Sequence, residues 1–419
     1  MKDQILANLN SAKVLESLYQ KAPKDFQQAF TEMYADIKGQ PAAQFWHHRL
    51  EFEPEVGKKS GPSRRQLIAL FVSGLIAVFL IQLPKLFSFA GGEVAFYARN
   101  NGLILLLGMS LYHLLSRETI SRMNVLLGVG LFAIAGLFVN LLPQGESSDI
   151  LSLIYLHLPL FLWSLYGLIY MDFQPKDFAG RITYLKHNGY LAIMGILLGI
   201  AGLFMTAITI GMFEAIQVHI EDFYVNYVVI SGVVCAPVVA VFVLQQFPNL
   251  TSKIAPVIAN IFSPLVLLTL VVYLISIFTV GKDPYEDRDF LLVFNIMLIA
   301  VMGIIIFSIT EGFSSSRSRF KEVVLLVLVA VSLLVDLVAL SAILYRVAEY
   351  GFTPNRTAVL GSNLLFFCHL GLIFLDLVKV NLSKMGIEKV DDTIARYLPF
   401  YVLWTILVIV GFPLVFGLK

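Results

Sequence analysis

One acidic side chain lies in the middle of a long apolar segment, where an ionised group is costly. Asp336 is flanked by Val335 and Leu337, and Ser332 precedes it by about one helical turn. A carboxylate at the centre of a bilayer must be protonated, paired or hydrated, and such residues often mark proton or ion pathways. Asp336 is therefore the first candidate for chemistry in this chain.

Three polar residues of the next apolar segment share a helical face. Ser362, His369 and Asp376 recur at seven-residue spacing, which places them on one side of a helix. If the two helices are antiparallel neighbours, Asp336 and His369 lie within about one turn of the same depth. Their contact, direct or through water, predicts an ion or proton relay of Asp336, His369, Asp376, Ser332 and Ser362. The alternative is a buried polar clamp between two helices, typically worth about 1 kcal/mol.

A polar turn joins these two segments and is the second candidate site. It contains Arg346, Glu349, Tyr350, Gly351, Pro354 and Arg356. Gly351 and Pro354 predict a tight turn. The charged residues that bracket this turn predict an ion pair that pins the two helices, and the alternative is that Arg356 is presented to an anionic substrate.

Other motifs of known chemistry are missing from the sequence. No G-x-S-x-G, H-E-x-x-H, P-loop or G-x-G-x-x-G occurs in a suitable context, so hydrolase, zinc protease and nucleotide-driven pump are unsupported. His47 and His48 lack the spacing of metal ligands, and Cys235 and Cys368 lie in apolar segments, so we expect no metal, no cofactor and no disulfide framework. The formal net charge of +1 offers no basic surface for nucleic acid.

The composition defines the elements that must position these residues. The chain has 419 residues, of which 58% are hydrophobic and 14% charged, and its mean hydropathy is +0.80. Soluble domains are about 25% charged. Apolar blocks of about 20 residues bounded by charges predict an all-α, polytopic membrane protein in contact with the lipid bilayer.

The first 62 residues have a different, more polar composition and predict a small helical cytosolic domain with its linker. A helix that Asn10 or Ser11 can cap, a second after Pro23 and a third that starts at Pro41 can share one miniature core. In the second helix the apolar residues follow the 3.6-residue helical period. Because 60 residues make a thin core, we expect this domain to need the transmembrane domain or a partner for full order, and a cytosolic protein is the candidate partner.

Residues 63–419 predict a transmembrane domain with about eleven spans. The candidate spans are 66–83, 102–115, 123–142, 150–171, 189–213, 224–244, 254–279, 290–310, 323–345, 357–378 and 397–418. The second is the weakest, because it reaches bilayer thickness only by including residues 97–101 or the segment around His113.

The charges of the loops predict the orientation. With the N-terminus inside, the loops on the cytoplasmic side hold more than twice as many Lys and Arg residues as those on the other side. The positive-inside rule then places the N-terminus in the cytoplasm and the C-terminus in the periplasm of a bacterial inner membrane.

Several stretches resemble a known family. YGFTPNR (350–356), VLGSNLL (359–365), DPYEDRDFLLVFN (283–295) and FYARNNG (96–102) are similar to a bacterial multi-pass membrane family, domain of unknown function 4153. LESLYQKAPKDFQQAF and AQFWHHRL resemble the helical N-terminal prefix of its Bacteroidota-type members. The resemblance covers most of the chain and implies no activity, although it makes the turn at residues 350–356 a family feature.

These observations leave more than one function open. The first hypothesis is an ion- or proton-coupled transporter or permease that uses Asp336 and His369. The alternative is a non-enzymatic membrane scaffold or regulator whose N-terminal domain binds a cytosolic partner. A lipid-modifying enzyme that uses outer acidic residues and Arg356 has less support, because no paired carboxylates accompany a pocket-forming motif. The sequence gives no substrate and no oligomeric state.

Overall fold

The computed structural model describes residues 1–52, 61–87, 89, 92–118, 121–143, 148–280, 285, 288–312, 319–382 and 384–418. All regular secondary structure in these ranges is helical, and they contain no β-strand. The chain divides into two compact units, Met1–Ser63 and Arg64–Lys419.

The N-terminal unit is built from four helices around its own core. They are α1 (Lys2–Ala7), α2 (Ala12–Lys21), α3 (Pro23–Ile37) and α4 (Pro41–Phe52). Pro23 and Pro41 each occupy the first position of a helix, where a missing N–H is harmless. The short α1, which the sequence pattern does not predict, contributes the fully buried Ile5 to this core.

Aromatic rings form the centre of this small core. The Phe26 ring lies 4.9 Å from the Trp46 ring and 5.6 Å from the Tyr19 ring, measured between centroids. Arg49 pairs with Glu16 and places its guanidinium 4.7 Å from the Trp46 ring. Three of the four helices therefore meet at one aromatic cluster.

The second unit confirms the predicted polytopic fold. Among the described residues, eleven helices are long and apolar enough to cross a membrane. They are α5 (Arg64–Ile81), α7 (Gly92–Ser116), α8 (Arg122–Leu141), α9 (Asp149–Tyr170), α10 (Phe178–Ala215), the segment Glu221–Gln246, α13 (Pro248–Val280), α14 (Arg288–Gly312), α15 (Arg319–Tyr350), α16 (Pro354–Asn381) and the segment Glu388–Phe416. The sixth comprises α11 (Glu221–Phe223), the π-helical η1 (Tyr224–Val229) and α12 (Ile230–Gln246); the last comprises α17 (Glu388–Ile406), the π-helical η2 (Leu407–Gly411) and α18 (Phe412–Phe416). The remaining short helix, α6 (Leu83–Leu86), follows α5.

Two of these helices are longer than their apolar runs. The second span, α7, includes both polar extensions considered from the sequence, residues 97–101 and His113. The fifth, α10, has 38 residues and begins at Phe178 rather than at Gly189. It starts there because the Asp177 side chain caps it by accepting a hydrogen bond of 2.9 Å from the backbone N–H of Gly180.

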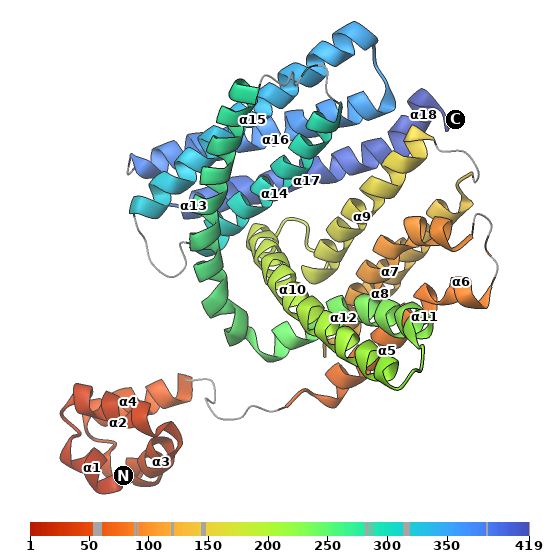
Figure 1. Cartoon of the computed structure of the whole chain (residues 1–419). Helices are drawn as coiled ribbons and strands as arrows, with labels where there is room; N and C mark the ends of the chain where they lie inside the picture. The colour runs from red at the N-terminus through yellow and green to blue at the C-terminus, as the bar shows by residue number, and fades with distance from the viewer. Residues whose placement is uncertain are drawn as a thin grey trace. The chain divides into compact units, whose positions relative to one another are not determined.

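The helices pack as two bundles that share α10 and the last span (Figure 1). One apolar core joins α5, α7, α8, α9 and α12, and a second joins α13, α14, α15 and α16. The first half of α17 contributes Val390 and Ile394 to the second core, while η2 contributes Val408 and Ile409 to the first. The last span therefore ties the two bundles together.

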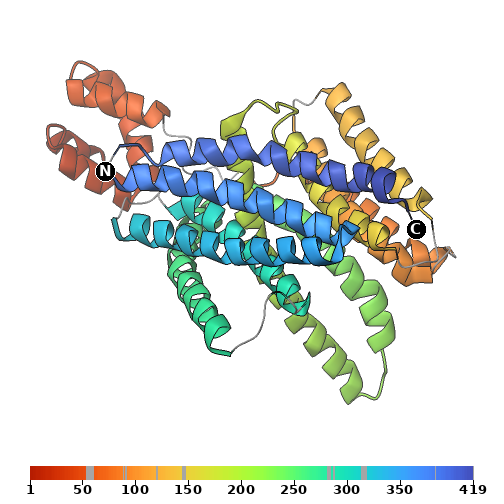
Figure 2. The same ribbon diagram turned by 90° about the horizontal axis from the view of Figure 1, so that it is seen from above.

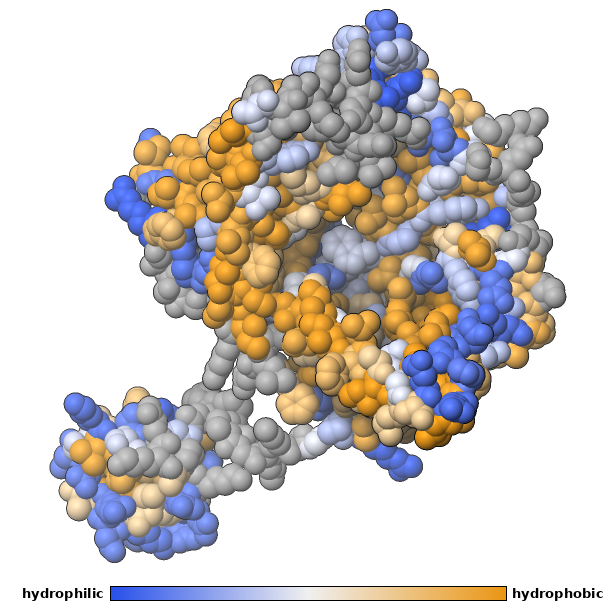
Figure 3. Space-filling view, viewed as in Figure 1, coloured by the Kyte–Doolittle hydropathy of each residue, from blue (hydrophilic) through white to orange (hydrophobic). Residues whose placement is uncertain are grey.

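Large apolar side chains cover much of the outer surface of these bundles. On α10, Leu203 is 76% and Phe204 is 69% exposed, and on α13 Leu268 is 61% exposed. Figure 3 shows the same helices as largely hydrophobic on the face in view. Such a surface is stable in contact with lipid and not with water.

Candidate functional site

A cluster of buried polar side chains in the second bundle lies where α15, α16 and α17 run side by side (Figure 2). Each of these helices contributes an ionisable or hydroxyl side chain to this cluster: Asp336, His369 and Tyr401. Apolar residues surround these three side chains, because the helix faces that pack together in the second core are mainly hydrophobic. The cluster is therefore a small polar group enclosed by a hydrophobic core.

Asp336 is fully buried and has no hydrogen-bond partner. Its exposed fraction is 0%, and neither carboxyl oxygen accepts or donates a hydrogen bond within the described part of the chain. The Ser332 hydroxyl, one turn away, donates instead to the backbone oxygen of Leu328 at 2.7 Å. An ionised carboxyl in such a place is strongly destabilising, so this carboxyl is stable only when it carries a proton or gains a partner.

His369 is also fully buried, but only one of its two ring nitrogens has a hydrogen-bond partner among the described residues. Its Nδ1 atom lies 2.9 Å from the hydroxyl of Tyr401, and its ring stacks on Tyr397 with 4.3 Å between centroids. Tyr397 is fixed in turn by donating to the backbone oxygen of Leu365 at 3.0 Å. The second ring nitrogen, Nε2, has no partner among the described residues. The imidazole is thus rigidly oriented with one position left for a proton or a ligand.

The structure does not pair Asp336 with His369. No hydrogen bond or ion pair joins them in the described residues. Instead, Tyr401 bonds His369 and also lies close enough to Asp336 for the two groups to interact electrostatically. Tyr401 is not among the site residues predicted from the sequence. Its four-residue spacing from Tyr397 puts both rings on one face of α17, but only the tertiary structure shows that this face meets His369.

The other residues of the predicted relay form separate contacts. Asp376 accepts hydrogen bonds from Lys379 at 3.0 Å and from Thr393 at 2.6 Å. Ser362 accepts one from the indole N–H of Trp404 at 3.0 Å. Both are clamps between α16 and α17 at other levels of the helices, and the structure does not unite them with Asp336 in one site.

The Trp404 clamp depends on a glycine. A Cβ atom at Gly361 would lie 1.9 Å from the Trp404 ring. Only a residue without a side chain therefore lets the indole reach Ser362.

The turn between α15 and α16 is closed by Arg356 acting on the backbone. Gly351 has φ of +75°, a conformation that suits glycine. Thr353 caps α16 by accepting from the backbone N–H of Arg356 at 3.3 Å. The Arg356 guanidinium donates to the backbone oxygens of Tyr350 at 2.7 Å and Gly351 at 2.9 Å.

The predicted ion pair at this turn is therefore replaced by bonds to carbonyl groups. No salt bridge involves Arg346, Glu349 or Arg356 among the described residues. The Arg356 guanidinium also lies 5.4 Å from the Tyr350 ring. Its Nη1 atom donates both of these hydrogen bonds back into the turn, which favours a structural role over recognition of an anionic substrate.

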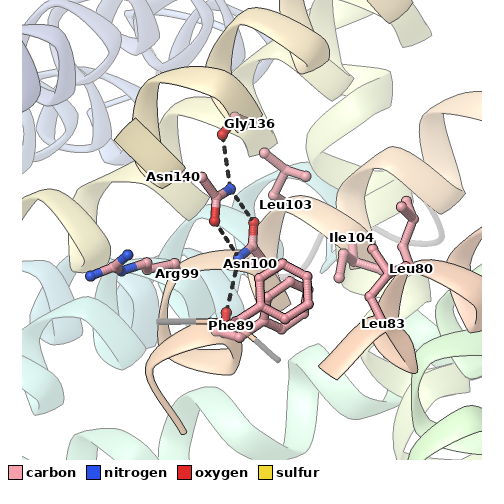
Figure 4. Close-up of a pocket in the computed structure, with 10 residues that line it drawn as sticks. Leu80, Leu83, Phe89, Arg99, Asn100, Leu103, Ile104, Gly136 and Asn140 are labelled. Atoms are coloured by element: carbon pink, nitrogen blue, oxygen red, sulfur yellow. Dashed lines mark hydrogen bonds between the residues drawn. The ribbon is translucent and has the colours of Figure 1, made fainter. Parts of the chain in front are cut away.

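A cavity of about 470 Å³ lies in the first bundle among α5, α6, α7 and α8 (Figure 4). Its lining is mainly apolar, and its polar edge is the amide pair of Asn100 and Asn140. The two amides exchange hydrogen bonds of 2.8 and 3.1 Å, and the Asn140 nitrogen also donates to the backbone oxygen of Gly136. Arg99 points away from this pair in Figure 4. Because the amide donors bond to the partner amide and to the helix backbone, this pair of asparagines holds α7 and α8 together.

The described residues contain no group of three His, Cys, Asp or Glu side chains that could hold a metal ion. Comparisons with protein-family models, with curated proteins and with solved structures find no match to this chain. The resemblance to the domain of unknown function 4153 therefore stays a prediction, and the function must be argued from the polar cluster itself.

Proposed function

We propose that this chain is an ion- or proton-coupled permease of a bacterial inner membrane, and that Asp336 is its titrating group. The observation that carries the proposal is the fully buried Asp336 carboxyl without any hydrogen-bond partner. Evolution seldom retains an ionisable residue at this depth without a functional reason. A purely structural carboxyl would be expected to resemble Asp376, whose two oxygens are both bonded.

The arrangement of the cluster supports proton exchange between its members. Tyr401 is hydrogen-bonded to His369 and lies within electrostatic range of Asp336. If the Asp336 side chain turned toward Tyr401, its proton would pass to the phenol oxygen while the phenol proton passed to an unprotonated Nδ1 of His369, leaving a carboxylate, a neutral phenol and an imidazolium. Such a pair is stable only with solvent or an ion nearby, so its formation is coupled to opening of the cluster.

The proposed orientation follows from the loop charges. The N-terminal unit and the beginning of α15 would face the cytoplasm, while the turn at Gly351 and the C-terminus would face the periplasm. The proton would then enter and leave the cluster along the α15–α16 interface.

Infrared difference spectroscopy of the purified protein tests the titrating group. We expect a protonated-carboxyl band that changes with pH in the wild type and is absent from Asp336→Asn. Asp376→Asn is the matched control on the neighbouring helix and should keep the band. A pH-difference spectrum that is the same in the wild type and Asp336→Asn would contradict the proposal.

A scaffold or regulatory protein remains the alternative, and one observation favours it. The N-terminal unit has its own core and exposes 64% of Phe45 on α4. If this unit docks a cytosolic protein, a strain carrying the chain without residues 1–57 should behave like a deletion strain, whereas Asp336→Asn should behave like the wild type. The reverse result would support the permease.

A further inference from the structure

A second cavity, of about 440 Å³, lies in the first half of the membrane unit, where α7, α9 and α12 end and α10 begins. Its polar lining includes His113, Arg117, Tyr170, Lys186, His187 and Tyr190. The cavity belongs to different helices from the Asp336 cluster. It has the volume and the mixed polar and aromatic walls that are usual in sites for small molecules.

The most unusual wall residue is His113, in the last turn of α7. It is only 5% exposed, and neither of its buried ring nitrogens makes a hydrogen bond of good geometry within the described residues, although the backbone of Tyr170 lies near the ring. A neutral imidazole carries one donor and one acceptor. Leaving such groups unsatisfied in a buried place is destabilising. A ligand in the cavity that offers a carbonyl oxygen would satisfy the donor.

Stacked rings form one wall of the cavity. The ring of Tyr170 stacks against two imidazoles, 5.1 Å from His113 and 4.8 Å from His187, measured between centroids. The planes are tilted by 26° and 30°. His187 is held in place by a bond of 3.1 Å between its Nε2 and the hydroxyl of Tyr166. This pre-formed wall suits a flat ligand that stacks on its rings.

The charges of the cavity are already compensated by the protein. Arg117 forms an ion pair with Asp172 and donates to the backbone oxygen of Tyr170 at 2.8 Å. The Lys186 ammonium lies 3.5 Å from the carboxylate of Glu311. Because each cation has an acidic partner, the cavity offers no uncompensated positive charge to a phosphate or another anion. A neutral ligand is therefore favoured.

We propose that this cavity binds the head group of a membrane quinone. A quinone ring is neutral and flat, its carbonyl oxygens can accept from His113, and its tail is soluble in the surrounding lipid. The position of the cavity at the ends of four spans is where a ring anchored in the bilayer reaches polar groups. This proposal does not depend on proton coupling at Asp336.

Tryptophan fluorescence of the full-length protein in detergent provides the test. Trp163 is two rings away from the cavity wall, because its ring lies 5.3 Å from Tyr184, which lies 5.5 Å from Tyr170. Quinones quench indole emission at short range. Titration with a decyl benzoquinone should give saturable quenching in Trp46→Phe/Trp404→Phe, in which Trp163 is the remaining tryptophan.

His113→Phe keeps a flat ring against Tyr170 but removes both ring nitrogens, so we expect its dissociation constant for the quinone to rise about tenfold. The matched control is His157→Phe, since His157 is a buried histidine of α9 outside the cavity whose Nδ1 is bonded to Leu153 at 2.8 Å. It should bind the quinone as tightly as its parent. Quenching that does not saturate, or equal affinity in His113→Phe, would overturn the proposal.

A second measurement needs no cavity variant. A photoreactive azidoquinone applied to the wild-type protein should label peptides that contain the ends of α7 and α9 or the start of α10, and excess decyl benzoquinone should suppress the labelling. Labelling that is confined to other helices, or that competition leaves unchanged, would contradict the proposal.

Discussion

At the scale of single residues, two aspartates on neighbouring helices differ in their hydrogen bonding. Asp376 receives hydrogen bonds from Lys379 and Thr393, whereas Asp336 is fully buried and receives none. The seven-residue spacing correctly predicted that Ser362, His369 and Asp376 share a face of α16. It could not predict a common site, because seven residues span about 10 Å of helix and side chains at that separation do not meet.

The contrast between these aspartates predicts opposite changes in stability. Replacing Asp336 by Leu removes an unpartnered polar group from an apolar core, so we expect the free energy of unfolding to increase by about 1–3 kcal/mol. Asp376→Leu is the paired variant and should lower it, because it leaves Thr393 and Lys379 without their acceptor. Thermal unfolding in detergent, followed by intrinsic fluorescence, compares both with the wild type. A loss of stability in Asp336→Leu as large as that in Asp376→Leu would show that Asp336 makes stabilising bonds.

At the scale of elements, the sequence predicts the existence of spans far better than their ends or contacts. Hydrophobic length alone gives eleven spans, because a bilayer imposes a minimum length on every crossing helix. The predicted start of α10, Gly189, lies well after its observed start at Phe178, because Lys186, His187 and Asn188 interrupt the apolar run. These residues remain helical because their side chains find partners on other helices, such as Glu311 for Lys186 and Tyr166 for His187. Such partners are tertiary information.

Two glycines of α16 provide a matched test of its packing. A Cβ atom at Gly361 would lie 1.9 Å from the Trp404 ring, whereas one at Gly371 meets no atom within 4 Å. Gly361→Ala should displace the indole, break its hydrogen bond to Ser362 and destabilise the protein by about 1–3 kcal/mol. Gly371→Ala should be neutral or slightly stabilising, because alanine is the better helix former.

Thermal unfolding and tryptophan emission of the two glycine variants check this prediction. The Gly361 variant should unfold at a lower temperature and show altered emission from Trp404. If both variants unfold at the temperature of the wild type, α16 and α17 do not pack through this glycine in solution.

At the scale of the whole molecule, the order of the helices in the chain differs from their order in space. The last span packs its first half with the α13–α16 bundle and its second half with the α5–α9 bundle. Composition and periodicity predict each helix separately, but they carry no signal for this long-range closure. They do carry a signal for orientation, because charges flank each span and an odd number of spans places the two ends of the chain on opposite sides of the membrane.

Reporter fusions test that orientation. A reporter fused after Lys419 should be active if it is alkaline phosphatase, which needs the periplasm, and inactive if it is β-galactosidase, which needs the cytoplasm. Truncation in the loop of residues 171–177, after four spans, should give the opposite pattern and serves as the control.

β-Galactosidase activity after Lys419 would require an even number of spans or an inverted chain. The first suspect would then be α7, because it is the least hydrophobic of the eleven spans. Fusions placed on either side of α7 would show whether it crosses the membrane, since a crossing helix must reverse the reporter pattern between its two ends.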